Sequence, residues 1–228
     1  MKDGLSRMKI GVFDSGVGGL SVAQAISKAL PEHEVLLRED KEHVPYGIRT
    51  PEQIFSFVVP IFEEMISAGC QIIVVACNTV STTLITQLRA RFPDTPLVAM
   101  EPMVKPAVSL TKSGVIAVCA TPATLASPRY HWLKETYAAG ITVLEPDCGD
   151  WAAMIEQSKV DESKIAGRLE AVLAGQADVL VLGCTHYHWI ETEIRQLAAG
   201  RALVLQPEQA VIAELRRVIT TRTTELAS

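Results

Sequence analysis

Two stretches of this chain share one design, IIVVACNTVSTTLITQLRA (72–90) and VLVLGCTHYHWIETEIRQLAA (179–199). Each begins with an apolar run typical of a strand that is covered on both faces. A small residue and a cysteine follow the run, then polar residues, and then a helical pattern that ends in Q-L-R-A or Q-L-A-A. The repeat predicts two strand–helix units of the same form, with Cys77 and Cys184 at the carboxyl ends of their strands.

Similar apolar runs alternate with helical patterns along the rest of the chain. Strands are predicted over 9–13, 35–38, 72–76, 97–99, 115–119, 141–144, 179–182 and 202–205. Helices are predicted over 19–30, 51–68, 79–91, 129–139, 161–174, 187–199 and 207–226. This alternation predicts an α/β fold with mostly parallel sheets and helices on both faces. Ligands bind such sheets at the carboxyl ends of the strands, where both cysteines are expected.

The composition is that of a folded, mildly acidic protein. Hydrophobic residues make up 48% and charged residues 21% of the 228 residues, which favours a packed core. The net charge of −5 gives no reason to expect nucleic-acid binding. The N-terminal residues have no signal-peptide pattern, and the most apolar helical stretch, 54–66, is too short to cross a bilayer. We therefore expect a cytoplasmic protein without membrane association.

The two cysteines at strand ends suit acid–base chemistry. Backbone N–H groups and the positive end of a helix dipole lower the pKa of a thiol at a helix N-terminus. Inverting a stereocentre requires one group to remove a proton from one face of a carbon and a second group to return one to the other face. Two thiols on opposite sides of a cleft could exchange these roles at each turnover. The alternative is a pair of buried structural cysteines beside helix caps formed by Asn78, Thr79 and Thr185.

The first predicted strand ends in DSGVGG (14–19), whose glycines allow a tight turn with N–H groups aimed at an anion. The dinucleotide pattern G-x-G-x-x-G is excluded, because Ser21 stands where its last glycine would be. Asp14 is either a base near the site or an ordinary turn residue. The segment PYG (45–47) is a turn whose phenol and N–H groups could hold a substrate.

His186 follows Cys184 by two residues, which suits activation of that thiol. A metal site made of Cys184, His186 and His188 is the weaker interpretation, because no fourth ligand stands at a recognisable spacing. We therefore expect no bound metal.

Six motifs together resemble the aspartate/glutamate racemase superfamily, and within it the glutamate racemases. They are DSGVGGLSV (14–22), PYG (45–47), ACNTVSTT (76–83), MEPMVKPAV (100–108), ATPAT (120–124) and GCTHY (183–187). The resemblance runs from about Ile10 to about Leu215, which is nearly the whole chain.

The resemblance implies cofactor-independent conversion of L-glutamate to D-glutamate for peptidoglycan synthesis. Cys77 and Cys184 would be the catalytic thiols, with Asp14 assisting Cys77 and His186 assisting Cys184. The residues implied to hold the amino acid are Ser15, Pro45, Tyr46, Gly47, Asn78, Thr79, Thr121 and Thr185. The resemblance also implies two pseudo-symmetric α/β domains with the site in the cleft between them. Here these would be 1–97 with 206–228, and 98–205.

Members of this family are often dimers, so a homodimer is expected. The helix predicted over 51–68 carries more apolar residues than one buried stripe needs, which predicts a self-association face. The residues concerned are Ile54, Phe55, Phe57, Val58, Val59, Phe62 and Met65. Deeper burial within the fold is the alternative.

The chain departs from the family pattern at a few positions. Glu39-Asp40 followed by KEHV replaces the usual G-D before PYG, and Ala120 replaces a glycine before Thr121. His188 stands in place of a proline, and Gln206-Pro207 in place of Ser-Gly. None of these changes removes a catalytic group. Two alternatives stay open: racemisation of aspartate or another amino acid, and a non-catalytic ligand-binding or regulatory protein on the same scaffold.

Overall fold

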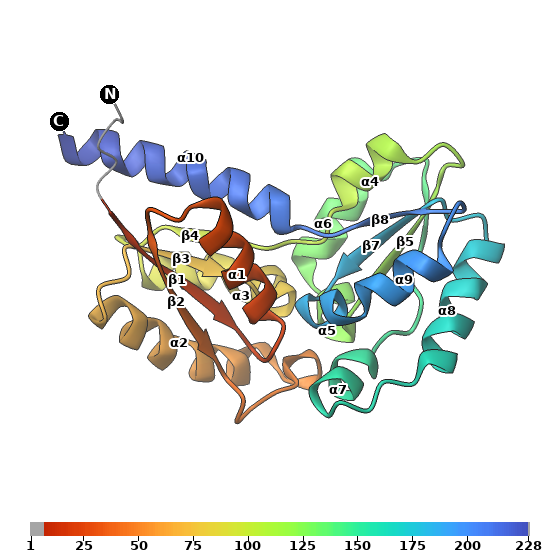
Figure 1. The fold of residues 1–228 in the computed structure, drawn as a ribbon, viewed down its shortest axis with the longest axis horizontal. Coiled ribbons are helices and arrows are strands. Elements are labelled where there is room, and N and C mark those ends of the chain that lie inside the picture. The colour runs from red at the N-terminus through yellow and green to blue at the C-terminus, as the bar shows by residue number, and fades with distance from the viewer. Residues whose placement is uncertain (1–6, 228) are drawn as a thin grey trace.

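The computed structural model describes residues 7–227; the ends of the first predicted domain, 1–6 and 228, lie outside the described residues. Two parallel four-stranded sheets lie side by side (Figure 1). The first contains β1 (Lys9–Asp14), β2 (Glu34–Glu39), β3 (Ile72–Val75) and β4 (Leu97–Ala99) in the order β2-β1-β3-β4. The second contains β5 (Val115–Ala120), β6 (Thr142–Leu144), β7 (Val179–Gly183) and β8 (Leu203–Leu205) in the order β6-β5-β7-β8.

The two sheets have the same topology, because each strand of the second occupies the place of its counterpart in the first. The inner pair β1 and β3 is parallel with Ile10 opposite Ile72, and the inner pair β5 and β7 is parallel with Ile116 opposite Val179. Every predicted strand is present, with ends that differ by at most one residue. The predicted α/β class, with two pseudo-symmetric and parallel halves, is confirmed.

Helices cover both faces of the first sheet. One face packs against α1 (Gly19–Ala29) and α10 (Glu208–Ala227), with Ile26 and Leu215 buried against Val12 of β1. The other face packs against α2 (Pro51–Ser67) and α3 (Asn78–Arg91), with Phe62 and Leu84 in the same buried cluster. The last helix of the chain therefore returns to the first half, as Figure 1 shows.

The second sheet is covered in the same way. Its helices are α4 (Val104–Leu110), α5 (Pro122–Leu125), α6 (Pro128–Tyr137), α7 (Trp151–Glu156), α8 (Glu162–Ala174) and α9 (Glu191–Leu197). Two 3-10 turns, η1 (Tyr46–Ile48) and η2 (Thr185–Ile190), follow β2 and β7. The chain crosses from one half to the other between β4 and α4 and again between β8 and α10. We propose these crossings as the domain boundaries.

The helical prediction was incomplete. It missed the short elements α4, α5, α7 and η1, and the helix predicted over 187–199 begins earlier, as the 3-10 turn η2, and becomes α-helical at Glu191. Helix α4 lies in the proline-rich stretch 93–106. Pro106 is its third residue, where a backbone N–H has no partner within the helix, so proline is tolerated.

The apolar surplus of α2 is accounted for mainly by burial. Ile54, Val58, Phe62 and Met65 are fully buried. Phe55, Phe57 and Val59 are half-buried, and the Phe57 ring stacks on His43. Self-association through α2 stays a prediction. Within residues 7–227, no helix combines the length and apolar character needed to cross a membrane.

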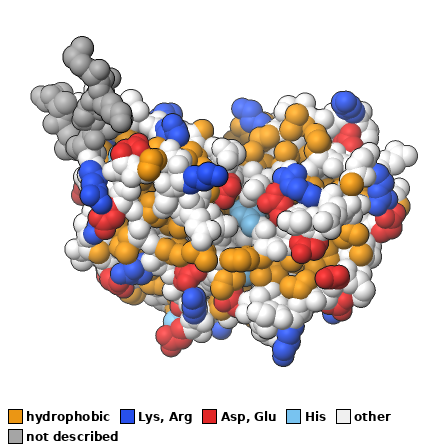
Figure 2. Space-filling view, in the orientation of Figure 1, with side chains coloured by type: hydrophobic (Ala, Val, Ile, Leu, Met, Phe, Trp, Pro, Cys, Tyr) orange, Lys and Arg blue, Asp and Glu red, His pale blue; other side chains and the backbone are white. Residues whose placement is uncertain are grey.

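The visible face in Figure 2 carries acidic and basic side chains interspersed among apolar ones, without a continuous basic patch on that face.

Candidate active site

Cys77 and Cys184 occupy equivalent positions, at the ends of β3 and β7. Both have extended backbone and are themselves the N-cap residues, of α3 and η2 respectively. The capping interpretation of Asn78, Thr79 and Thr185 is therefore wrong, because these residues lie inside the first turns that the cysteines begin. The side chains of these three residues therefore do not cap a helix.

The two cysteines open into one small cavity between the halves. Its lining residues are Ser15, Val44, Pro45, Tyr46, Gly47, Cys77, Asn78, Thr79, Thr121, Ala152, Cys184, Thr185 and His186. Every residue expected at the site lines this cavity except Asp14, which lies fully buried behind it. Val44 and Ala152 were not predicted. The structure thus brings together residues from both halves of the chain.

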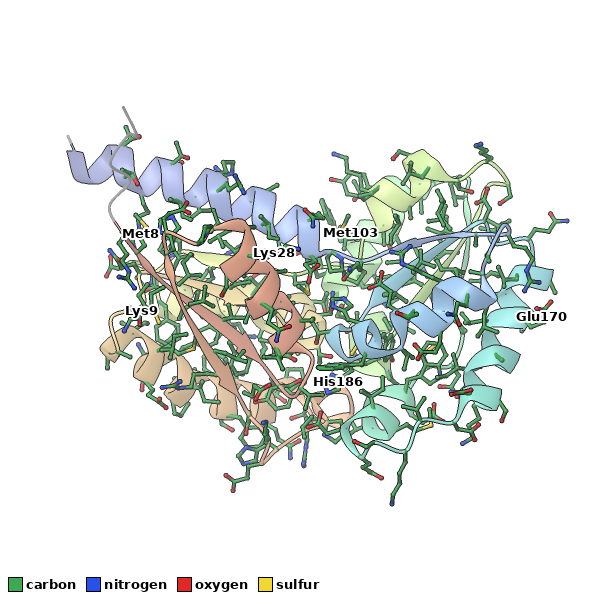
Figure 3. The ribbon with its side chains drawn as sticks, viewed as in Figure 1. Met8, Lys9, Lys28, Met103, Glu170 and His186 are labelled. Atoms are coloured by element: carbon green, nitrogen blue, oxygen red, sulfur yellow. The ribbon has the colours of Figure 1, made fainter. Side chains whose placement is uncertain are left out.

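On the second-half side, Cys184 begins a short hydrogen-bonded chain. Its Sγ lies 3.9 Å from His186 Nδ1, and His186 Nε2 lies 2.7 Å from Glu156 Oε2. Burial lowers the pKa of His186, but the hydrogen bonds to Cys184 and Glu156 outweigh it and raise the pKa to about 11. The imidazole is therefore protonated at neutral pH. Figure 3 shows His186 at the junction of the two halves.

Glu156 is a residue that the sequence did not reveal. It ends α7, a helix that was itself missed, and lies thirty residues before His186 in the chain. Its hydrogen bond with His186 holds the pKa of the carboxyl below its usual range. Its Oε2 also accepts from the backbone N–H of Val17 at 3.4 Å, so it contacts the glycine turn of the first half.

On the first-half side, Cys77 Sγ lies 3.5 Å from Ser15 Oγ. Burial and the nearby charge of Asp14 raise the pKa of this thiol to about 12. The Asp14 carboxylate accepts from Thr185 Oγ1, at 3.2 Å to each oxygen, and from the backbone N–H groups of Ser15 and Gly19. Asp14 therefore influences Cys77 through its charge while it binds a residue of the opposite half.

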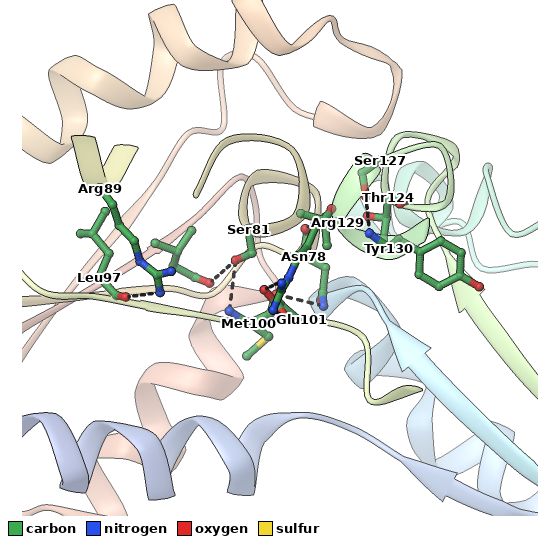
Figure 4. Close-up of polar contacts among 12 residues, drawn as sticks. Asn78, Ser81, Arg89, Leu97, Met100, Glu101, Thr124, Ser127, Arg129 and Tyr130 are labelled. Atoms are coloured by element: carbon green, nitrogen blue, oxygen red, sulfur yellow. Dashed lines mark hydrogen bonds and ion pairs between the residues drawn. The ribbon is translucent and has the colours of Figure 1, made fainter. Parts of the chain in front are cut away.

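A cluster of hydroxyl groups joins the halves on the other side of the cavity. Thr79 Oγ1 lies 3.0 Å from Thr121 Oγ1, and Thr124 Oγ1 is 3.1 Å from the latter. Asn78 Nδ2 donates to the Met100 carbonyl at 3.3 Å, which Figure 4 shows beside Ser81. Asn78 Oδ1 is buried, and no hydrogen-bond partner for it is present among the described residues. This oxygen is a free acceptor in the cavity wall.

The two histidines considered for a metal point to different partners. His186 binds Glu156, whereas His188 Nδ1 lies 3.2 Å from Ser21 Oγ. Ser21 donates its own proton to the Gly18 carbonyl, so His188 is the donor of the second bond. Burial lowers the pKa of His188 to about 4, which keeps the ring neutral. Over residues 7–227, no group of three or more His, Cys, Asp and Glu side chains has the arrangement of a metal site.

In the glycine-rich turn (residues 14–19), Gly18 has no room for a side chain, because Thr185 of the opposite half lies against it. A Cβ on Gly18 would lie 2.6 Å from the backbone carbon and from Oγ1 of Thr185. We expect Gly18→Ala to lower the free energy of unfolding by about 1–3 kcal/mol, since overpacked sites relax only in part. Urea unfolding measures this. Gly167→Ala is the matched control: its Cβ would meet nothing within 4 Å, so the helix should gain about 0.5–1 kcal/mol. Equal effects of both changes would contradict the close approach.

Asp14 carries a stability penalty that depends on pH. Burial raises its pKa from 3.8 to about 6. Between these values the folded protein holds a proton that the unfolded chain releases, so stability falls as pH rises from about 4 to 6. We expect Asp14→Asn to raise the free energy of unfolding at pH 8 by up to about 3 kcal/mol and to leave it nearly unchanged at pH 4. Urea unfolding at both pH values checks this. A variant destabilised at pH 8 would show that the hydrogen bonds of Asp14 outweigh its burial.

Solved structures that resemble this fold include glutamate racemases. The chain matches a glutamate racemase isoform from Bacillus anthracis with a TM-score of 0.80 and 27% identity, covering 94% of this chain and 82% of that one. It matches the Escherichia coli glutamate racemase, solved with L-glutamate and the activator UDP-MurNAc-ala, with a TM-score of 0.81 and 29% identity. That match covers 94% of this chain and 83% of the other. Fold and site together define an isomerase of the amino-acid racemase class.

Sequence comparison identifies the family. The model of the Asp/Glu/Hydantoin racemase family matches residues 10–215. A glutamate racemase of Roseiflexus sp. (strain RS-1) is 37% identical over 221 residues, which covers 95% of this chain and 81% of the relative. One from Pseudomonas syringae pv. tomato is 38% identical and covers 92% of this chain and 78% of the relative. The chain belongs to the Asp/Glu/Hydantoin racemase family.

Proposed function

We propose that this protein interconverts L-glutamate and D-glutamate in the cytoplasm, without a cofactor, and supplies D-glutamate for peptidoglycan synthesis. The observation that carries the proposal is the pair of cysteines, which end equivalent strands of two sheets of the same topology and open into one cavity. The glutamate specificity is supported by relatives of that name at 37% and 38% identity over most of the chain.

We propose one starting state, in which Cys77 is a thiol and Cys184 is a thiolate. Cys77 holds its proton, because burial and Asp14 raise the pKa of its thiol. Cys184 lies beside the imidazolium of His186, which can balance the charge of a thiolate. In this state Cys184 removes the α-proton from one face of the substrate, leaving a planar carbanion. Cys77 then gives its proton to the opposite face, and the two thiols have exchanged roles.

The lining of the cavity suits an amino acid with two carboxylates. The lining residues include no arginine or lysine, so carboxylates would be held by hydroxyl groups and by backbone N–H groups at the start of α3. Ser15, Thr79 and Thr121 supply the hydroxyls, whereas the Thr185 hydroxyl donates to Asp14. The bond from the Asn78 amide nitrogen to the Met100 carbonyl fixes the orientation of the amide. Its Oδ1, an acceptor without a partner among the described residues, suits the α-ammonium group.

Circular dichroism of the purified, reduced and metal-chelated protein tests the proposal. L-glutamate, D-glutamate and L-aspartate are supplied separately without an added cofactor. We expect both glutamate signals to decay to zero at comparable rates. Decay with aspartate alone would keep the chemistry and overturn the substrate. A flat signal with all three from folded protein would favour the non-catalytic alternative.

We also propose a homodimer, in line with the half-buried apolar residues Phe55 and Val59 on α2. Sedimentation at micromolar concentration should give a mass of two chains, and Val59→Glu should weaken the association. A strictly monomeric protein would contradict the dimer. A dimer unaffected by the substitution would contradict only the role of α2.

A further inference from the structure

The segment between β2 and α2 forms one wall of the cavity and is held from outside it. Asp40 directly follows β2, its side chain is buried, and its backbone N–H donates to the Asp14 carbonyl at 3.2 Å. The Tyr46 phenol donates to Asp40 Oδ2 at 2.6 Å, and His43 Nδ1 lies 2.9 Å from both carboxylate oxygens. Because a carboxylate only accepts, the proton of the His43 ring lies on Nδ1.

His43 is in turn packed on a long helix. Its imidazole stacks on the Phe57 ring of α2, with centroids 3.8 Å apart and planes inclined by 12°. Val58 and Phe62, on the next turns of α2, are fully buried in the apolar cluster that packs against the first sheet. Arg49 Nε also donates to the His43 carbonyl at 3.3 Å. A continuous chain of contacts therefore leads from helix α2 through His43 and Asp40 to Tyr46 in the cavity.

The other side of this segment meets the second half of the protein. A Cβ on Gly47 would lie 2.9 Å from Thr121 Cβ, so η1 lies directly against the N-terminus of α5. Tyr46, Gly47 and Thr121 all line the cavity. Any shift of the segment therefore changes the distance between the two walls that would enclose a substrate.

We propose that His43 is a positioning residue for racemisation. It holds the Asp40 carboxylate in place, and Asp40 in turn holds the phenol of Tyr46. The packing of His43 on α2 therefore determines the width of the cavity between Tyr46 and Thr121. His43 lies in the KEHV segment, where the chain departs from the family pattern, and the resemblance assigns it no role. The expected effect on racemisation rests on the proposed function, whereas the hold of His43 on Asp40 and Tyr46 does not.

Three substitutions of His43 separate its hydrogen bond from its bulk. The amide nitrogen of His43→Asn can occupy the place of Nδ1, whereas that of His43→Gln reaches toward the place of Nε2. We expect His43→Ala and His43→Gln to raise KM for glutamate about tenfold with kcat nearly unchanged, as for the loss of one charge-assisted hydrogen bond that acts on binding. His43→Asn should recover most of the loss. His131→Ala, an exposed histidine on α6, is the matched control and should leave KM unchanged.

The reactivity of Cys77 gives a second readout that needs no turnover. Cys77 is 4% exposed, so iodoacetamide should alkylate it slowly in the native protein, as followed by mass spectrometry. We expect His43→Ala and His43→Gln to accelerate this alkylation about tenfold, His43→Asn to stay near the native rate, and the core residue Cys119 to stay unmodified in all.

The two readouts keep the proposals apart. The native protein could fail to racemise glutamate while His43→Ala and His43→Gln still show faster alkylation of Cys77. That result would support the positioning role of His43 and overturn the proposed substrate. Unchanged KM and unchanged alkylation in His43→Ala would overturn the positioning role and leave the racemase proposal standing. Equal losses in His43→Asn and His43→Ala would also overturn it, because the donor at Nδ1 would then be irrelevant.

Discussion

Replacing either Cys77 or Cys184 by serine should lower racemisation of both glutamate enantiomers by about 10²- to 10⁴-fold. An alcohol is a much weaker acid than a thiol, so serine can neither remove the α-proton nor return one at neutral pH. Each turnover uses both groups, one on each face of the carbon. Loss of either therefore blocks both directions, even though the other thiol is intact.

The symmetry of the reaction sharpens this expectation. The two enantiomers have equal free energy in water, so the equilibrium constant is one, and kcat/KM must fall equally in the two directions. Individual kcat and KM values need not change equally, because Cys77 and Cys184 have different neighbours. Circular dichroism progress curves starting from each enantiomer measure all four constants.

Cys148→Ala is the matched control. Cys148 is buried in the core of the second half, outside the cavity lining, and its loss should change kcat/KM by less than about twofold. Full activity in Cys77→Ser or Cys184→Ser would refute the two-thiol mechanism. Far-UV circular dichroism of each variant shows that it is folded.

The second large effect is expected at His186. His186→Asn should lower kcat about 10²-fold, because it removes the cation that lies 3.9 Å from the Cys184 sulfur. Glu156→Gln should act in the same direction but less, by about tenfold, since the imidazole remains while its charged partner is lost. The loss of kcat should therefore be larger in His186→Asn than in Glu156→Gln, with the fold intact in both variants.

The pH profile separates this electrostatic role from a purely structural one. Glu156 is one of the groups that raise the pKa of His186, so Glu156→Gln lowers that pKa. The imidazolium is then lost at a lower pH, and the alkaline limb of kcat should move toward neutral pH. Glu162→Gln, an exposed carboxylate on α8, is the control and should leave the profile in place. An alkaline limb that stays in place in Glu156→Gln would show that Glu156 only supports the fold.

The strands were predictable from the sequence because inner strands of parallel sheets are buried on both faces. That burial leaves continuous apolar runs such as those of β3 and β7, which a reader can recognise without the structure. The helices α5 and α7 were not predictable, since they have four and six residues and so show too little of the helical period.

The site was predictable where motifs carried it and unpredictable where partners meet only in space. Glu156 reaches His186 because Trp151 and Tyr187 pack edge to face, with ring centroids 5.1 Å apart, which places α7 against η2. The hydrogen bond from the Tyr46 phenol to Asp40 forms because the loop that contains both residues folds back on itself. No local pattern in either segment signals such a contact.

The sequence by itself therefore determined that two cysteines end equivalent strands, because strand identity and strand ends are local properties of apolar runs and turn residues. Only the tertiary structure decided the surroundings of each thiol. Burial and Asp14 raise the pKa of Cys77, and Cys184 lies 3.9 Å from a histidine whose pKa is raised in part by Glu156. The physical reason is that charge interactions and desolvation depend on distances and burial in space, which separation along the chain does not report.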